Sequence, residues 1–340
     1  MKVTPSPSLK SLNTFGLDAS AHSLVTIESE EDILALPGFD PAFDLVLGGG
    51  SNVVFLSNVP GTVYLNRIRG RRIVRESGDT VAVDAGAGEN WHELVLWTLE
   101  QGLNGLENLS LIPGSVGAAP IQNIGAYGVE LESVLESVTA WDWKSSSWAV
   151  LEREDCKFGY RDSLFKNGEP DRYMITSVRF NLSRRFEPQL DYAGLRQEVD
   201  KEAASTLDAQ AVSQAVIRSR SQKLPDPAAS GNAGSFFKNP VLSAETADEL
   251  RNRHPGISAW PLADEQVKVS AAWMIEACGL KGLSEGGACV SSKHALVLVN
   301  TGSASGHDVS TLKIEIQKAV FETFGVRLEP EPRLIDFPAP

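Results

Sequence analysis

A glycine-rich run between residues 108 and 130 is the feature that most restricts the fold of this chain. The run, NLSLIPGSVGAAPIQNIGAYGVE, contains four glycines and two prolines. Glycine and proline cost roughly 1 and 3 kcal/mol per site in a helix interior, and the run does not alternate as a half-buried strand does. It therefore predicts a loop whose backbone approaches another group closely, with N–H groups directed at that group. A plain surface loop is the alternative, but it would have no need of Leu111, Ile112, Val116, Ile121 and Ile124.

A large flat ligand with a pyrophosphate suits such a backbone surface, and a second glycine run supports this hypothesis. The sequence LGGGSN at residues 47–52 lies between two apolar stretches, which predicts a strand, a tight turn and a second strand. Backbone N–H groups of such a turn, together with the Ser51 hydroxyl, can bind a nucleotide phosphate. The run is not a Gly-x-Gly-x-x-Gly fingerprint and no helix follows it, so a Rossmann fold is not supported.

Composition excludes several classes of protein. A chain of 340 residues predicts two or three domains, and a net charge of −13 argues against a nucleic-acid groove or an anionic membrane surface as partner. An anionic small ligand needs only a local cluster of cations. The cysteines and the histidines are scattered without metal-ligand spacing, so neither a disulfide framework nor a metal site is expected. The amino terminus does not resemble a signal peptide and no long apolar stretch occurs, so a cytoplasmic protein is expected.

Hydrophobic periodicity predicts α+β structure throughout the chain. Residues 12–67 form a small α+β unit with a helix at 29–36, which Ser29 would cap. A larger unit follows and encloses the glycine-rich run, with an amphipathic helix at 89–101 and strands at 71–75, 80–84, 138–143, 148–152 and 174–182. Residues 185–222 are polar and predicted mostly helical, with the clearest helix at 211–219 and a loop around Tyr192 at 190–195 before it. The KLPDP segment then marks a boundary. The last third has predicted helices at 243–253, 271–278 and 308–324 and a strand at 295–299.

Three side chains are candidates for chemistry. Arg161 follows the flexible Gly159 in FGYRDS and could hold a carboxylate or a phosphate with both arms of its guanidinium, although a surface pair with Asp162 is the alternative. Ser235, in GNAGSFFKNP, could place a hydroxyl beside an apolar wall, or it could only satisfy a turn. Glu331 lies between prolines in LEPEPR, which direct its side chain; a polar chain end is the alternative.

Together these motifs, in this order, resemble one family, the UDP-N-acetylenolpyruvoylglucosamine reductases of bacterial peptidoglycan synthesis. The resemblance runs from NTFG at residue 13 through GGGSN, GAGENWHEL, the glycine-rich run, FGYRDS, KLPDP and GNAGSFFKNP to LEPEPR. It implies an α+β fold in which a two-domain FAD-binding cradle of the vanillyl-alcohol-oxidase (PCMH) type precedes an α+β substrate-binding domain. The implied divisions are residues 1–67 and 68–222 for the two FAD-binding subdomains and 223–340 for the substrate domain.

The resemblance also implies ligands. Non-covalent FAD, reduced by NADPH, would lie across two segments, with no metal. The residues implied for FAD are Gly48, Gly49, Gly50, Ser51, Asn52, Pro113, Gly114, Ser115, Gly117, Ala118, Gln122, Asn123, Gly125, Ala126, Tyr127 and Gly128. The segment around Tyr192 resembles the form of the family that closes a tyrosine loop over its substrate. The residues implied for binding of the UDP-sugar are Tyr192, Lys223, Asn239 and His294.

The implied reaction reduces the enolpyruvyl group of UDP-N-acetylglucosamine enolpyruvate to give UDP-N-acetylmuramate. Arg161 and Glu331 match the family's pair at the substrate carboxylate, and Ser235 matches its proton donor. Two other hypotheses remain open at this point: a flavin oxidase or dehydrogenase of the same fold acting on another sugar or alcohol, and a non-enzymatic protein that binds nucleotide sugars. A monomer is the plain expectation for the family.

Overall fold

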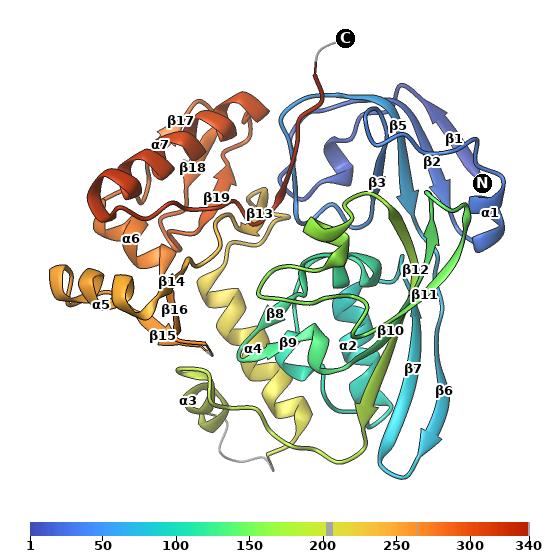
Figure 1. Ribbon diagram of the computed structural model, residues 1–340, viewed down its shortest axis with the longest axis horizontal. Helices are drawn as coiled ribbons and strands as arrows, with labels where there is room; N and C mark the ends of the chain where they lie inside the picture. The colour runs from blue at the N-terminus through green and yellow to red at the C-terminus, as the bar shows by residue number, and fades with distance from the viewer. Residues whose placement is uncertain (202–206, 263, 339–340) are drawn as a thin grey trace. The chain divides into compact units, whose positions relative to one another are not determined.

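The chain forms two compact units in the computed structural model, which describes residues 1–201, 207–262 and 264–338 (Figure 1). The first unit contains Met1–Pro7, Ala21–Gly50 and Val59–Gln222. The second contains Ser8–Ser20, Ser51–Asn58 and Lys223–Pro340. Two short amino-terminal segments therefore belong to the same unit as the carboxy-terminal third of the chain.

The first sheet of the first unit has four strands in the order β1-β2-β5-β3. These strands are β1 (Lys2–Pro5), β2 (Ala21–Ile27), β5 (Val59–Asn66) and β3 (Leu45–Leu47). β2, β5 and β3 run parallel, whereas β1 pairs with β2 in the antiparallel sense. The helix α1 (Glu30–Leu34) begins after Ser29, whose side chain accepts a hydrogen bond from the Asp32 N–H, so the predicted cap is confirmed.

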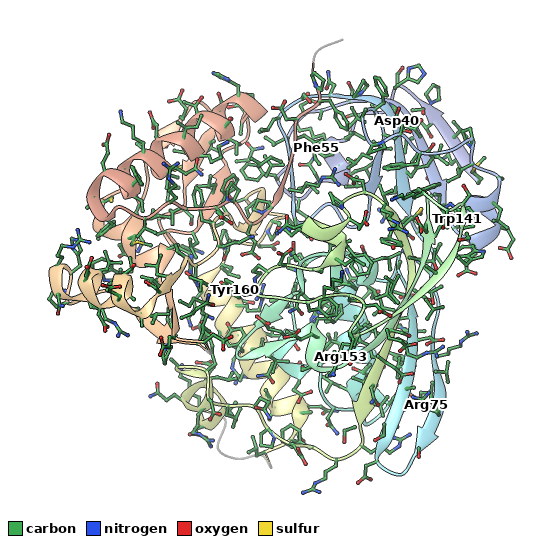
Figure 2. The ribbon with its side chains drawn as sticks, viewed as in Figure 1. Asp40, Phe55, Arg75, Trp141, Arg153 and Tyr160 are labelled. Atoms are coloured by element: carbon green, nitrogen blue, oxygen red, sulfur yellow. The ribbon has the colours of Figure 1, made fainter. Side chains whose placement is uncertain are left out.

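The second sheet has five antiparallel strands in the order β11-β10-β12-β7-β6. Their bounds are β11 (Ser147–Glu152), β10 (Leu135–Asp142), β12 (Tyr173–Ser183), β7 (Thr80–Gly86) and β6 (Arg71–Ser77). Figure 2 labels Trp141 on β10 and Arg75 on the edge strand β6. Trp141 faces Met174 at the start of β12, whereas Arg75 pairs with Ala82, which faces the far end of β12, so the two side chains mark opposite ends of the sheet.

One helix and the glycine-rich run share a core with this sheet. The helix α2 (Trp91–Glu100) begins at the cap Asn90, and its buried face joins the inward side chains of β7, β10 and β12. Leu109 and Val116 of the glycine-rich run lie in the same core, and the Trp91 indole N–H donates to the Leu109 carbonyl at 2.9 Å. The run itself forms the 3-10 turns η2 (Glu107–Leu109), η3 (Val116–Ala118) and η4 (Pro120–Gln122) and a hairpin of β8 (Gly125–Ala126) and β9 (Val129–Glu130). Its predicted departure from regular structure is confirmed.

The first unit ends in two helices, α3 (Leu195–Asp200) and α4 (Ala209–Lys223). Leu190, Leu195 and the buried face of α4 form a small apolar cluster beneath Tyr127. The loop predicted around Tyr192 is confirmed for residues 190–194, and the clearest predicted helix, at 211–219, lies within α4. The mostly helical prediction is wrong only for 185–189, which form no helix; Leu190 is buried and the Gln189 carbonyl accepts a hydrogen bond there. Residues 202–206 of that prediction lie outside the described part of the chain.

Within its described residues, the second unit has three small sheets and three helices around one core. Its strands are β13 (Asn232–Ser235), β19 (Val297–Asn300), β18 (Ala288–Val290) and β17 (Ser284–Glu285) in one sheet, β14 (Val241–Ser243), β16 (Gln266–Val269) and β15 (Ala259–Pro261) in another, and the parallel pair β20 (Arg333–Ile335) and β4 (Val53–Phe55). The helices are α5 (Ala244–Arg253), α6 (Ala271–Ala277) and α7 (Gly306–Phe324), all close to their predicted bounds.

Within the described residues, no helix is long and apolar enough to cross a membrane. The boundaries expected at residues 67 and 222, as divisions into two FAD-binding subdomains and a substrate domain, stay a prediction.

Removal of the Ser305 hydroxyl should destabilise the second unit. Ser305 Oγ accepts the Asp308 N–H at 3.1 Å, and Asp308 accepts the Ser305 N–H at 2.9 Å, which makes a reciprocal cap at the start of α7. Ser305→Ala is expected to lower the free energy of unfolding by about 1 kcal/mol in a urea titration. Ser303→Ala, at an exposed position just before the cap, is the matched control and should change little. Equal stability of the two variants would contradict the assigned cap.

Candidate functional site

The two glycine runs meet backbone to backbone in the first unit. A Cβ atom built on Gly49 would lie 2.7 Å from Gly114 Cα, and one on Gly48 would lie 2.4 Å from Ser115 Oγ. Both distances are far below van der Waals contact, so any larger residue would force the two runs apart. The predicted close approach is therefore confirmed, but its first partner is the chain's own backbone.

Ser115 supplies the clearest sign that a further group belongs here. Its hydroxyl oxygen is buried and, among the described residues, has no hydrogen-bond partner. Buried polar atoms are almost always paired, so an orphan in a glycine-lined contact points to a polar ligand group that completes it. The site therefore fits the phosphate or ring oxygens of a nucleotide cofactor.

Other N–H groups of the glycine-rich run are already occupied. The Val116 N–H donates to the Glu89 carbonyl and the Gly117 N–H to the Ala87 carbonyl, each at 2.9 Å. A Cβ on Gly117 would lie 2.4 Å from the Ala87 Cβ. The prediction that the run directs its N–H groups at a ligand is thus wrong for these two positions, because they hold the run against the segment before α2. Elsewhere, Ala118 and Gln122 end the turns η3 and η4, and Gly125, Ala126, Tyr127 and Gly128 make the hairpin of β8 and β9.

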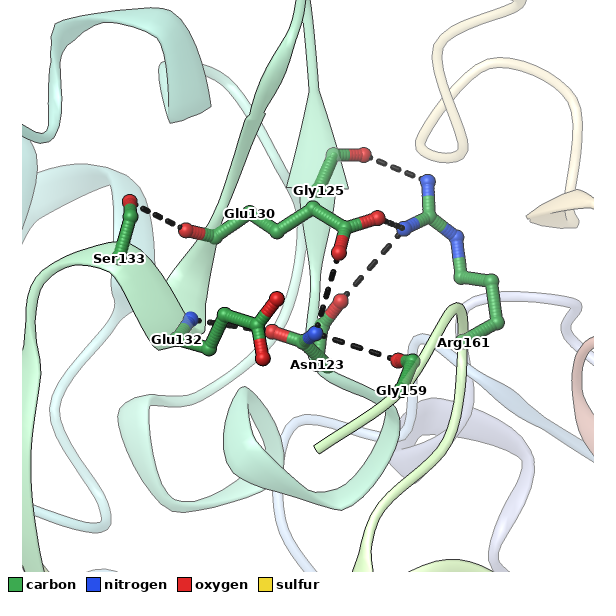
Figure 3. A network of polar contacts seen from close by, with 7 residues as sticks. All are labelled: Asn123, Gly125, Glu130, Glu132, Ser133, Gly159 and Arg161. Carbon is green, nitrogen blue, oxygen red and sulfur yellow. Dashed lines mark hydrogen bonds and ion pairs between the residues drawn. The ribbon is translucent and has the colours of Figure 1, made fainter. Parts of the chain in front are cut away.

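Arg161 extends over the same run (Figure 3). Its Nη2 donates to the Gly125 carbonyl at 2.6 Å, and its Nη1 lies 3.8 Å from a Glu130 carboxylate oxygen. The guanidinium also lies over the ring of Tyr160, labelled in Figure 2, with 5.3 Å between CZ and the ring centroid. A Cβ on Gly125 would come within 2.9 Å of Nη1, so glycine leaves the room that the guanidinium needs.

Asn123 connects the elements around Arg161, as Figure 3 shows. Its amide nitrogen donates to a Glu130 carboxylate oxygen and to the Gly159 carbonyl, both at 3.2 Å, and its amide oxygen accepts the Glu132 N–H at 3.1 Å. Asn123 is fully buried and has a left-handed backbone with φ of 44°, which asparagine tolerates better than most residues. One buried amide therefore fixes the FGYRDS segment relative to the glycine-rich run.

Sequence reasoning did not select His92 and Arg220, which hold the same run from the other end. Leu111 has a left-handed φ of 58°; its N–H donates to His92 Nδ1 at 3.0 Å and its carbonyl accepts from Arg220 Nε at 3.2 Å. Burial lowers the pKa of Arg220, and the nearby Arg161 lowers it further. A second cation therefore lies near Arg161. In the sequence, the available signals were that His92 lies in the motif GAGENWHEL and that Arg220 lies just before KLPDP.

Tyr192 packs against the hairpin turn of the glycine-rich run. Its ring meets the Tyr127 ring edge-on, with centroids 5.0 Å apart, and 48% of the residue remains exposed. The structure thus brings together a residue predicted for the cofactor and one predicted for the substrate.

In the second unit the structure joins Ser235 to the segment of Glu331. Ser235 ends β13 after Gly234, whose φ is 72°. The Glu331 N–H donates to the carbonyl of Phe236, the next residue, at 2.8 Å, and the Lys238 N–H donates to the Glu329 carbonyl at 2.9 Å. Two distant motifs therefore form one backbone ladder, which continues where the Arg333 N–H donates to the Asn52 carbonyl next to Ser51.

The remaining predicted binders also lie in the second unit. Asn239 Oδ1 accepts the Ala271 N–H at 3.0 Å, so the amide NH₂ is the end that can reach a ligand. His294 Nδ1 accepts the Leu296 N–H at 3.2 Å, which places its hydrogen on Nε2. Burial lowers the pKa of His294, and the positive charges of Lys281 and the exposed Lys223 lower it further. Lys281 and Lys223 therefore make the surroundings of His294 locally cationic in an acidic chain.

Comparisons with known proteins agree with these two units. Residues 23–147 match the FAD binding domain family, and residues 226–335 match the C-terminal domain of UDP-N-acetylenolpyruvoylglucosamine reductase. The first match places the chain among FAD-binding proteins. UDP-N-acetylenolpyruvoylglucosamine reductase from Pseudomonas aeruginosa is 48% identical over 96% of this chain and 97% of that protein, and the one from Paraburkholderia xenovorans is 48% identical over 95% of each.

A solved structure shows the same likeness. The crystal structure of UDP-N-acetylenolpyruvylglucosamine reductase (MurB) from Thermus caldophilus superposes with a TM-score of 0.68 at 27% identity, covering 99% of this chain and all of that one. The chain therefore belongs to the UDP-N-acetylenolpyruvoylglucosamine reductase family, and the FAD-cradle fold class predicted from the sequence is confirmed.

His92 should make the stability of the first unit depend on pH. Burial and the charge of Arg220 lower the pKa of His92 below the ordinary value of about 6.5. The neutral imidazole is therefore favoured in the folded state, and its contribution is complete above about pH 6.5 and is lost as the pH falls through the lowered pKa. The free energy of unfolding should fall less between pH 7.5 and 5.5 in His92→Leu than in the parent. His22→Leu, at an exposed position of β2, is the control; parallel pH profiles for parent and His92→Leu would contradict this assignment.

Proposed function

We propose that this chain reduces UDP-N-acetylglucosamine enolpyruvate to UDP-N-acetylmuramate with NADPH, through bound FAD, in peptidoglycan precursor synthesis. The observation that carries the proposal is the family membership, at 47–48% identity over nearly the whole of this chain and of its relatives. When bound, FAD supplies the two-electron carrier that NADPH reduces and that the enolpyruvyl group oxidises. The residues of the chain bind and orient the cofactor and the substrate, and they protonate the substrate.

The glycine contact of the first unit is proposed to hold FAD. Gly48, Gly49, Gly114 and Ser115 offer a backbone surface and one buried hydroxyl without a partner. Both suit the pyrophosphate and polar ring edge of the cofactor. We propose the same role for the other residues predicted from the family, with residues 1–67 and 68–222 as the two cofactor-binding subdomains.

Arg161 is proposed to bind the carboxylate of the enolpyruvyl group. Hydride addition to the methylene carbon places negative charge on the adjacent carboxylate as an enolate, so a fixed cation there stabilises the transition state more than the ground state. Its contacts with Gly125, Tyr160 and Glu130 support this role, because they fix the guanidinium before substrate binds. Glu331 is proposed to act at the same carboxylate.

Ser235 is proposed to deliver the proton to the other alkene carbon, which completes the reduction. Its position at the end of a strand, next to the backbone ladder that carries Glu331, supports this role. Tyr192, Lys223, Asn239 and His294 are proposed to contact the uridine diphosphate portion. Lys223 contributes positive charge beside His294, and the neutral imidazole has an Nε2–H to donate, so both suit a diphosphate.

We further propose that the protein acts as a cytoplasmic monomer without a nucleic-acid or membrane partner. The net charge of −13 supports the last part, since it repels polyanions and anionic lipid surfaces.

Gly49→Ala should lower FAD content. The added Cβ would clash with Gly114 and open the contact that carries Ser115. We expect a lower ratio of flavin to protein in the purified variant and weaker retention of FAD on dialysis, both measured by absorbance. Gly256→Ala is the matched control, because the nearest atom to its Cβ is a Trp273 side-chain carbon at 3.4 Å. Full flavin content in Gly49→Ala would contradict the proposed cradle.

Ser235→Ala tests the reaction itself. NADPH without oxygen should bleach the flavin absorbance of parent and variant at similar rates, and added UDP-N-acetylglucosamine enolpyruvate should restore it. The restoring step is expected to be roughly a hundredfold or more slower in Ser235→Ala, because the general acid is absent. Ser284→Ala, an exposed serine of the same unit, is the control. If only oxygen restores the parent's colour, the protein is a flavin oxidase and the proposed substrate is wrong.

A further inference from the structure

A single buried amide joins the hairpin turn of the glycine-rich run to the segment that carries Tyr192. Asn108 is 1% exposed, and its Nδ2 donates to the Tyr127 carbonyl at 2.9 Å and to the Gln189 carbonyl at 2.8 Å. Both hydrogens of the amide are therefore used, on two backbone positions far apart in the sequence. No property of the sequence around Asn108 indicates this role, because its partners are carbonyl oxygens.

The first of these positions is a strained turn. Tyr127 and Gly128 connect β8 to β9 with φ values of 50° and 85°, the signs of a type I′ turn. This turn favours asparagine, aspartate or glycine at its first central position, and a bulky residue there costs about 1 kcal/mol or more. The hydrogen bond from Asn108 to the Tyr127 carbonyl fixes the peptide plane that follows the strained residue. The amide thus helps to set the direction of the Tyr127 ring.

The second position is the base of the Tyr192 segment. Gln189 lies three residues before Tyr192, and between them Leu190 is buried in the apolar cluster with α4. Beyond Leu190 the segment has exposed side chains until Leu195, and Gly194 has a left-handed φ of 84°. The segment is therefore held at its base and exposed at its tip. The base is held by Leu190 and Asn108.

We propose that Asn108 is a positioning residue for UDP-sugar binding, because it holds the Tyr127 turn and the Tyr192 segment in the relation that pairs the two rings. The inference rests on the proposed function in one respect, namely that Tyr192 contacts the uridine diphosphate portion of the substrate. Asn108 itself touches neither Arg161 nor the second unit's Ser235 in any contact described. Its loss removes this donor from the partly buried carbonyls of Tyr127 and Gln189 and lets the turn and the segment move independently. Ordering of Tyr192 then has to occur during binding, which weakens affinity rather than the chemical step.

The experiment compares Asn108→Ala with Asn104→Ala in the FAD-loaded full chain. Asn104 Nδ2 donates to the Ser183 carbonyl at 2.8 Å, so the control also removes an amide-to-carbonyl bond in the same unit, away from Tyr192. Asn108→Ala should raise the Kd of UDP-N-acetylglucosamine enolpyruvate, measured by titration calorimetry, and its KM by roughly tenfold each. The kcat should stay within about twofold, as expected for lost binding without lost chemistry. Asn104→Ala should leave all three unchanged.

A double-mutant cycle separates positioning from general destabilisation. In the Tyr192→Ala background, Asn108→Ala should change the Kd by less than about twofold, because the residue through which it acts is gone. Fold-changes that multiply would overturn the proposal, as would an unchanged Kd in the single variant. Asn108→Ser keeps one donor and should give an intermediate Kd, which maintains the test if Asn108→Ala fails to fold.

The outcomes also separate this inference from the proposed function. Binding of the UDP-sugar that depends on Asn108, without reoxidation of the flavin, would support the positioning role and contradict the proposed reaction. Turnover by the parent, together with a Kd for Asn108→Ala equal to that of the parent, would support the proposed reaction and contradict the positioning role. A parent chain that binds no UDP-sugar would overturn both.

Discussion

The backbone contact between Gly48–Gly49 and Gly114–Ser115 is the constraint on which the first unit depends. Gly49 follows the parallel strand β3, whereas Gly114 lies in the run that packs on the five-stranded sheet. Because the two backbones come so close that a Cβ would overlap the other chain segment, this contact sets how the two sheets of the unit approach. Among the described residues it also leaves the buried Ser115 hydroxyl without a hydrogen-bond partner, so the contact that closes the fold also creates the surface that we propose for the cofactor. A substitution at this contact would then alter packing and cofactor binding together.

Around this contact, backbone strain is balanced by side-chain hydrogen bonds. Leu111, Asn123, Tyr127 and Arg161 all have left-handed φ values, a conformation that costs roughly 1–2 kcal/mol for a residue with a side chain. Two of them have their backbone groups held by the side chains named above, and a third binds the run through its own side chain. His92 and Arg220 hold Leu111, and Asn108 holds Tyr127, while the Arg161 side chain binds the Gly125 carbonyl. Such strain persists only where the surroundings determine it, and it collects at functional sites. Its position here agrees with the residues that the family resemblance selected.

The sequence predicted individual helices and strands better than it predicted which distant segments pack together. Apolar periodicity with a cap was enough for α2 and α5, and the strained shape of the glycine-rich run followed from its glycines and prolines. The strands β13 to β18 were missed because they are short and carry little alternation. Asn108, His92 and Arg220 were not selected because their partners are backbone groups, which leave no trace in composition; for His92 and Arg220 the signal was their position in or next to a family motif. Local sequence patterns also do not predict that residues 8–20 and 51–58 belong to the second unit.

Charge explains how an acidic chain can bind anionic nucleotides. With a net charge of −13, the long-range field opposes an anionic ligand, but at physiological ionic strength it is screened beyond about 8 Å. Nearby cations therefore determine whether an anionic ligand is attracted. Each unit has its own: Arg161 near Arg220 in the first, and Lys223 and Lys281 near His294 in the second. Burial is the main cause of the lowered pKa values of Arg220 and His294, and the neighbouring cations lower both pKa values further. Glu130 beside Arg161 and Glu276 beside Lys281 offset part of the repulsion between these cations in the free protein, and an anionic group of the proposed ligands would offset more of it, so local charge favours binding although the net charge opposes it.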